Sequence, residues 1–308
     1  GFASRLTRPV WRTERDNAAK DRYFTSAATL LPAKIVFLRR MTNYLPETPA
    51  ELRAAALQGL LIRDADDKSR FVLNLPDALP CDPAQKFACP EGIPGRPDKP
   101  ELIAPGKVGR RAMHTPEGRA VLLHALAHIE MNAINLALDI IWRFPQMPLP
   151  FYSDWMKVAR EEAKHFSMLN AHLRDLGFSY GSFPAHNSLW EMAEKTKADL
   201  TARLALVPRT MEARGLDVTP GLRQKLIQAG DLRAGEIMQT IYEEEIGHVE
   251  IGNRWYNYQC QKEGHDPLAY YPVLSERYKA PRLRGPFNLE GRRQAGFTES
   301  ELVWLQGQ

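Results

Sequence analysis

The sequence has little cysteine, and its three cysteines form no recognisable pattern. Cys81, Cys89 and Cys260 are odd in number and include no Cys-x-x-Cys pair. This excludes a disulfide framework or a zinc ribbon as the organising feature of the fold. A reducing compartment is the default expectation, and a bridge between Cys81 and Cys89 within their Pro-rich loop stays open.

Long hydrophobic runs are also missing. No uninterrupted apolar stretch reaches the roughly 18 residues that a membrane span needs. The apolar content of 44% and the charged content of 25% are ordinary for a globular chain. We therefore expect no transmembrane segment.

A strong excess of charge of one sign is absent as well. The formal net charge is +4, which is too small to indicate nucleic-acid binding without a clustered patch. Only the first forty residues lean basic, with nine Lys or Arg against three acidic residues. Such an arm fits an RNA- or protein-binding segment, a mitochondrial targeting region or a solvated tail. We expect a mitochondrial matrix location, or otherwise a cytoplasmic one.

Proline and glycine set the expected organisation of the chain. From Pro80 to Lys107 they are so closely spaced that an extended loop is favoured over a helix. We therefore expect residues 1–112 to be an N-terminal extension that wraps around the rest, with a short helix from the Thr48-Pro-Ala-Glu51 capping box to about Leu61 and a short strand over 71–75. Residues 265–308 are expected to form a tail of short helices, the last one capped by Thr298, that packs on the bundle.

Residues 113–264 carry four long amphipathic patterns with no competing strand pattern. The predicted helices run over 115–144, 153–177, 188–215 and 219–264. Pro208 should kink the third of them. Together these patterns predict an all-α fold: a four-helix bundle with a Pro-rich N-terminal extension and a short helical C-terminal tail.

The same Glu-x-x-His spacing occurs twice, at Glu162 and His165 and again at Glu245 and His248. Residues three apart lie on nearly the same face of a helix, so each pair can aim a carboxylate and an imidazole at one point. One copy is expected by chance in a chain of about this size. Two copies, on the second and fourth predicted helices and nowhere else, favour a metal site over a coincidence of surface charge.

The two remaining predicted helices each offer one glutamate. Glu130 lies among small apolar residues, where a solvated carboxylate is not expected. Glu212 follows the Pro208 kink, and its competitor Glu194 lies about five turns away. The six predicted ligands supply four carboxylates and two imidazoles, whose negative charge two divalent or trivalent cations would roughly neutralise.

Three further residues near these positions have alternative interpretations. Tyr242, one turn before Glu245, is a candidate hydrogen-bonding or redox residue next to the metal, although a core tyrosine with a satisfied hydroxyl is more common. His124 and His128 have the spacing of a zinc-binding pair, but no His-Glu-x-x-His string or Pro-Cys-x-x-Cys partner accompanies them. We expect these two histidines behind the metal ligands or on the surface of the bundle.

Several segments together resemble a known family. They are the run from Thr115-Pro-Glu-Gly-Arg to His128-Ile-Glu130, the Arg160-Glu-Glu-Ala-Lys-His165-Phe segment, the Met211-Glu-Ala-Arg-Gly215 turn and the Glu244-Glu-Ile-Gly-His248-Val string. The sequence is similar to ferritin-like di-iron carboxylate proteins and, more narrowly, to the family called domain of unknown function 455, over about 97–305. The first ninety residues lie outside this similarity.

The resemblance implies a ferritin-like bundle that holds two iron ions, with manganese as an alternative. Related di-iron hydroxylases act on modified tRNA bases and on quinone precursors. By that analogy, the expected activity is oxygen-dependent hydroxylation or oxidation of an organic substrate, either a small molecule or an RNA base. Two alternatives stay open: a metal-containing structural subunit of a large mitochondrial assembly, and ferroxidase or iron handling. An oligomer is compatible with all three.

Overall fold

The computed structural model describes residues 49–107 and 112–308, which belong to one compact unit. The described residues are mainly helical, and their only β-type pairing is an isolated bridge between Leu102 and Ala185. The prediction of an all-α fold is therefore confirmed. The basic N-terminal arm lies outside the described residues.

Two short helices precede the long ones and pack on them. α2 (Leu52–Leu61) contacts α4, and α3 (Ala65–Leu73) contacts α5. Glu51 caps α2 by accepting a hydrogen bond from the amide of Ala54, and Thr48 of the predicted capping box lies outside the described residues. The strand predicted over 71–75 was wrong, because Phe71 and Val72 belong to the buried face of α3.

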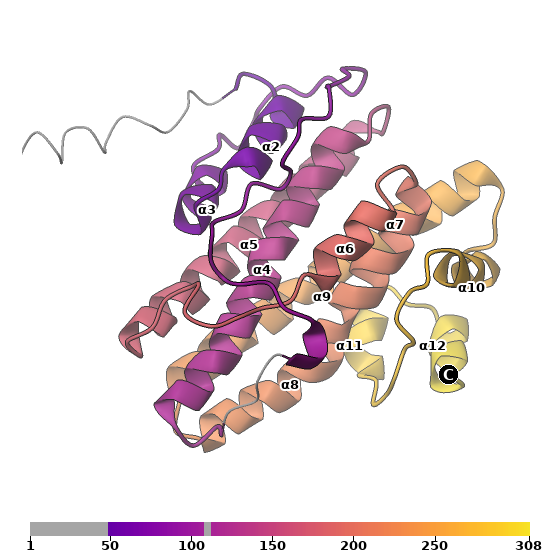
Figure 1. Cartoon of the computed structure of the whole chain (residues 1–308). Coiled ribbons are helices and arrows are strands. Elements are labelled where there is room, and N and C mark those ends of the chain that lie inside the picture. The colour runs from indigo at the N-terminus through magenta and orange to yellow at the C-terminus, as the bar shows by residue number, and fades with distance from the viewer. Residues whose placement is uncertain (1–48, 108–111) are drawn as a thin grey trace, which may run out of the picture. The chain divides into compact units, whose positions relative to one another are not determined.

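α4 (Pro116–Arg143) and α5 (Leu149–Asp175) form the most extensive helix pair (Figure 1). α5 begins four residues earlier than predicted, because prolines are tolerated in the first turn, where their missing N–H would have no helical partner. α4 is long and apolar enough to cross a membrane by length and composition alone. Since 72% of its apolar window is buried inside the fold, its apolar character is accounted for by the protein core.

The predicted third helix is divided in the structure. It consists of α6 (Ser188–Lys195), α7 (Leu200–Leu206), the π-helical segment η2 (Val207–Glu212) and α8 (Ala213–Gln228). The irregular segment contains Pro208, where the kink was expected. The predicted start of the fourth helix at Thr219 was wrong, because α8 continues through that residue to Gln228. The last long helix, α9 (Leu232–Glu263), begins only after Gly230.

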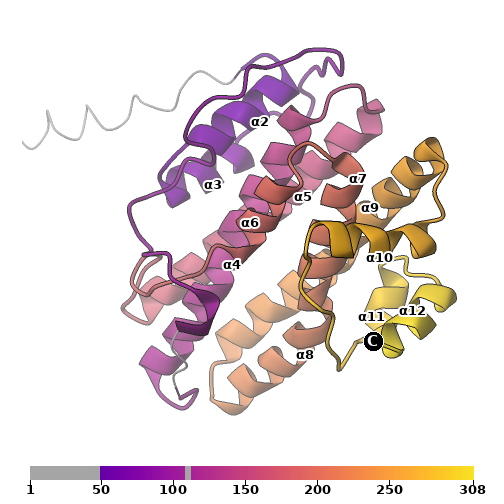
Figure 2. The ribbon, with the colours of Figure 1, turned by 45° about the vertical axis from the view of Figure 1, so that its right-hand side comes forward.

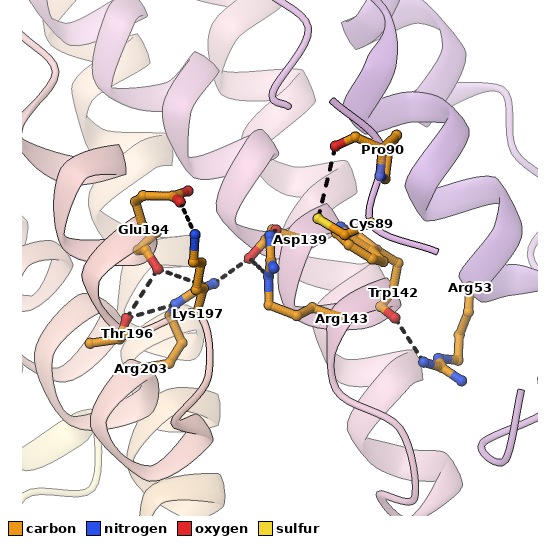
Figure 3. A network of polar contacts seen from close by, with 11 residues as sticks. Arg53, Cys89, Pro90, Asp139, Trp142, Arg143, Glu194, Thr196, Lys197 and Arg203 are labelled. Atoms are coloured by element: carbon orange, nitrogen blue, oxygen red, sulfur yellow. Dashed lines mark hydrogen bonds and ion pairs between the residues drawn. The ribbon is translucent and has the colours of Figure 1, made fainter. Parts of the chain in front are cut away.

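A buried ion pair joins α4 to α7. The Arg203 guanidinium donates to Asp139 Oδ2 at 2.6 Å, and Arg143 donates to Asp139 from the next turn of α4 (Figure 3). The side chain of Asp139 is completely buried. A buried carboxylate of this kind is tolerated because both arginines neutralise it and donate hydrogen bonds to it.

Three short helices form the C-terminal part: α10 (Pro267–Arg277), α11 (Leu289–Gln294) and α12 (Glu299–Gln306). Thr298 caps α12 in a capping box with Glu301, as predicted. The tail lies beside α7, α8 and α9 (Figure 2). Arg292 anchors it through a buried ion pair with Asp217 of α8, at 2.8 Å.

Candidate metal centre

Four buried side chains from three helices meet inside the fold. Glu130 comes from α4, Glu162 and His165 from α5, and Glu245 from α9. One potential ligand atom from each lies within 4.8 Å of all the others. The structure therefore brings together four of the six residues predicted from the sequence, and this buried cluster could hold a metal ion.

His248 adjoins this cluster through Glu162. Its Nδ1 lies 3.0 Å from Glu162 Oε1 and 3.5 Å from Glu245 Oε1. The other oxygen of Glu162, Oε2, lies 3.5 Å from Nδ1 of His165. The Glu162 carboxylate thus lies between the two imidazoles, whose ring centroids are 5.7 Å apart.

Three atoms at the centre of the cluster lack hydrogen-bond partners. Glu162 Oε2, His165 Nδ1 and His248 Nδ1 are all buried, and none forms a hydrogen bond within the part of the chain that the structure describes. An unsatisfied buried polar group costs about 1–3 kcal/mol, so three in one place need an explanation. Coordination of a cation would satisfy all three, because each can offer a lone pair.

The opposite nitrogen of each imidazole is hydrogen-bonded to a glutamate on the facing helix. His165 Nε2 lies 2.8 Å from Glu244 Oε2, and His248 Nε2 lies 2.8 Å from Glu161 Oε2. A carboxylate can only accept, so each Nε2 carries the proton and each neutral imidazole would have its Nδ1 lone pair free. This is the outer-shell arrangement that orients metal-ligating histidines.

Glu161 and Glu244 were not predicted from the sequence. In the structure, Glu161 reaches His248, and Lys164 forms an ion pair with Glu244. The detectable signal was a longer repeat. Both motifs read Glu-Glu-x-x-His, and in each the first glutamate bonds to the histidine of the other.

Burial and mutual repulsion shift the acidities of the clustered groups. Burial and the adjacent Glu162 raise the pKa of Glu130 well above its usual value. Burial opposes ionisation of Glu162 too, but the charge of His248 and the close approach of both imidazoles outweigh it and lower the pKa of Glu162. Burial likewise disfavours charged histidines, yet the surrounding carboxylates raise the pKa of His165 and His248 well above normal. Without metal, the cluster therefore keeps protons near neutral pH.

Glu212 ends η2 and lies near the same carboxylates. Burial, followed by the charges of Glu162 and Glu245, raises the pKa of Glu212 well above its usual value. The competing Glu194 is exposed and forms an ion pair with Lys197 on the surface. Of the two candidates in this region, Glu212 is the one whose pKa the charges of the cluster raise, although it is not one of the four converging residues.

Tyr242 and the two additional histidines have other partners. The Tyr242 hydroxyl accepts a hydrogen bond from Asn288 of the C-terminal tail, at 2.9 Å. His124 and His128 are buried, so a place on the bundle surface was wrong for them. Both histidines are hydrogen-bonded to residues 176–187, which connect α5 to α6. His124 Nε2 accepts a hydrogen bond from the amide of Gly181, and His128 Nε2 donates one to the carbonyl of His186. A catalytic role for Tyr242 stays a prediction.

Comparisons with known proteins confirm the narrower of the two resemblances in the sequence, that to the family called domain of unknown function 455. The family described as "Protein of unknown function (DUF455)" matches residues 61–303. The match begins well before residue 90, so the expectation that the first ninety residues lie outside the family was wrong. An "Uncharacterized protein" of Haemophilus influenzae is 48% identical over 222 residues, covering 70% of this chain and 77% of the relative. No solved structure matches the chain.

Proposed function

We propose a metal-dependent function for this chain, which belongs to the DUF455 family: an oxygen-dependent oxidoreductase with a ferritin-like di-metal carboxylate centre. The observation that carries the proposal is the convergence of Glu162 Oε2, His165 Nδ1 and His248 Nδ1 as buried atoms without hydrogen bonds. The helix arrangement supports it. α5 and α9 each contribute two of the proposed ligands, and α4 and the α7–η2–α8 run each contribute one.

Six residues would hold two iron ions, or manganese ions. They are Glu130, Glu162, His165, Glu212, Glu245 and His248, with Glu162 between the two histidines. The donor set fits: four carboxylates and two neutral imidazoles suit iron or manganese, whereas a site without thiolates does not favour zinc of the structural type. When bound, a redox-active metal pair supplies electrons that activate dioxygen for oxidation of an organic substrate.

The residues around the ligands hold them in the required state. Glu161 and Glu244 keep each Nε2 protonated, which directs both Nδ1 lone pairs towards the centre. Lys164 in turn offsets the charge of Glu244. The apolar helix faces around the cluster exclude bulk water, which strengthens every electrostatic interaction within it.

A groove beside α5 offers an approach for the substrate. Its volume is about 670 Å³, within the range of small-molecule sites. Leu79, Leu149 and Met156 give it apolar walls, while Lys157 and Glu161 are among its polar residues. Because Glu161 is hydrogen-bonded to His248, a molecule at that end of the groove would lie one side chain away from a proposed ligand.

The proposal is tested by anaerobic loading with Fe(II), followed by mixing with dioxygen and recording of the optical spectrum. We expect a fast spectral change and a stoichiometric uptake of dioxygen, both lost in Glu245→Ala. Glu243→Ala is the matched control, because Glu243 is exposed and bonds only to Gln239 among the described residues. An Fe(II)-loaded protein that does not react with dioxygen would exclude the oxidoreductase assignment.

The same experiment separates the alternatives from the sequence. Oxidation of many iron equivalents per chain, with storage of the product, would favour ferroxidase activity. Bound metal without reaction, together with stable incorporation into a large particle, would favour a structural subunit. The mitochondrial location rests on the basic arm and stays a prediction.

A further inference from the structure

A pocket with mainly apolar walls and a few polar side chains lies outside the metal cluster, between the Pro-rich segment and α4. Its wall on one side is formed by 95–102, and on the other by residues of α4 and by Tyr180. Gly95 allows this wall to approach α2 closely: a Cβ at Gly95 would lie 2.2 Å from the carbonyl oxygen of Leu61. The pocket wall is therefore fixed in place by backbone contact, as the hydrogen bond from the Gly95 amide to the Leu60 carbonyl also shows.

Asn135 presents an unused donor at this pocket. The residue is only 3% exposed and lines the pocket. Its Oδ1 accepts a hydrogen bond from the ammonium of Lys68, which fixes the orientation of the amide, since an ammonium can only donate. Its Nδ2 forms no hydrogen bond among the described residues and is not one of their fully enclosed atoms, so it is open to the pocket.

Arg96 is the second unused donor. Its guanidinium forms no hydrogen bond or ion pair within 49–107 and 112–308, although Arg96 is partly buried. Its one aromatic neighbour, Trp190, has its ring centre 6.0 Å away, near the limit of a cation–π contact. A half-buried guanidinium with five free N–H groups is suited to receive a carboxylate in bidentate geometry.

His128 and Tyr180 of the pocket, and Lys68 behind it, are already hydrogen-bonded. His128 Nε2 donates to the carbonyl of His186, so its Nδ1 accepts the hydroxyl proton of Tyr180 at 2.8 Å. Lys68 donates to the carbonyls of Leu60 and Gly95 in addition to Asn135. The pocket lining among the described residues thus contains one cation, Arg96, and two unused donors, the Arg96 guanidinium and Asn135 Nδ2. Lys68 lies behind Asn135, and Glu191 is a carboxylate whose charge acts on Arg96 without a hydrogen bond.

We propose that this pocket binds the carboxylate group of a small organic acid, held by the Arg96 guanidinium and by Asn135 Nδ2. The size of the pocket selects the ligand class. It leaves about 30 Å³ for the centres of water molecules, which is room for on the order of two waters. A carboxylate fits this space, whereas a nucleotide does not. Burial and the charge of Arg96 lower the pKa of Lys68, and an anion in the pocket would offset that positive field.

Acetate is the probe for this site. Binding is measured by titration calorimetry against the full chain in one fixed metal state, with chloride of equal ionic strength as the reference. We expect saturable binding of one acetate per chain and a rise in the thermal unfolding midpoint. Arg96→Met should weaken acetate binding at least about tenfold, since a bidentate charged contact is lost. Arg233→Met removes the same charge from an exposed arginine paired with Glu236 and should bind acetate like the unmodified chain.

Three outcomes would overturn the proposal. They are the absence of saturable acetate binding, equal binding by Arg96→Met and the unmodified chain, and tighter binding of orthophosphate than of acetate. Asn135→Leu provides a second variant that removes only the uncharged donor. Its expected effect is smaller than that of Arg96→Met, and an unchanged affinity would remove Asn135 from the site.

Discussion

Glu161 Oε2 lies 2.8 Å from His248 Nε2, and Glu244 Oε2 lies at the same distance from His165 Nε2. Two Glu-Glu-x-x-His motifs, one on α5 and one on α9, therefore hold each other's histidine. Since the partners are 87 and 79 residues apart in the chain, the arrangement forms only when α5 and α9 pack together. Orientation of the proposed ligands is in this way coupled to folding.

The three adjacent residues Glu243, Glu244 and Glu245 should contribute differently to metal affinity. Glu245→Gln should remove a ligand, and Glu244→Gln should weaken metal binding by about 10- to 100-fold, because the outer partner of His165 is lost. Glu243→Gln should have no effect, as Glu243 is exposed. Competition titration with a chromophoric chelator measures all three affinities. Equal affinities for Glu243→Gln and Glu244→Gln would contradict the assigned role of Glu244.

Metal should stabilise the fold through the histidines. Binding energy at a site formed only in the folded chain adds to the free energy of unfolding. We therefore expect Fe(II) or Mn(II) to raise the thermal midpoint of the unmodified chain, and this rise to disappear in His165→Ala and His248→Ala. Differential scanning calorimetry with and without metal gives the comparison. A rise that persists in both variants would mean that metal binds elsewhere.

Metal binding should release protons. The raised pKa values of His165, His248 and Glu130 mean that the metal-free cluster is protonated near neutral pH. A cation must displace these protons, so the apparent affinity should rise as pH rises. Calorimetry in buffers of different ionisation enthalpy measures the number of protons released. A binding enthalpy that does not depend on the buffer would show that the metal displaces none.

Some of the site residues in these predictions could be identified from the sequence alone, and others could not. Glu162, His165, Glu245 and Glu130 were predictable because a ligand spacing of three follows directly from helix geometry and because Glu130 occurs among small apolar residues. Glu161 and Glu244 were not, since their partners lie on a facing helix. Their positions depend on how α5 and α9 are placed relative to each other, and helical periodicity says nothing about that.

The helix boundaries also divide into those that local sequence signals predict and those that depend on tertiary packing. The ends marked by capping residues, such as Thr115, Thr298 and Gly264, were predicted well because the signals act locally. The strand predicted over 71–75 and the helix start predicted at Thr219 were wrong because tertiary packing outweighed local preference. Phe71 and Val72 are buried as part of a helix, and α8 continues past Pro220 beside α9.

Lys68 gives a prediction that does not involve the metal. Burial, with a smaller contribution from Arg96, lowers the pKa of Lys68 to about 7, from a usual value of 10.5. Between these two values the unfolded chain binds a proton that the folded chain lacks, so the free energy of unfolding should rise with pH, by about 1.4 kcal/mol per pH unit from this residue. Urea titrations at several pH values measure the slope.

Lys68→Met should reduce that slope, whatever it does to the absolute stability. Lys157→Met is the matched control, because the Lys157 side chain is 62% exposed and its removal should leave the slope unchanged. If Lys68→Met and Lys157→Met give the same slope, Lys68 is not the group that titrates.

The metal content of the purified chain tests the central claim most directly. After anaerobic loading with Fe(II) and removal of free metal, elemental analysis should find about two ions per chain, and a strongly reduced content in Glu245→Ala but not in Glu243→Ala. A metal content near zero in the unmodified chain, or one that Glu245→Ala leaves unchanged, would contradict the account.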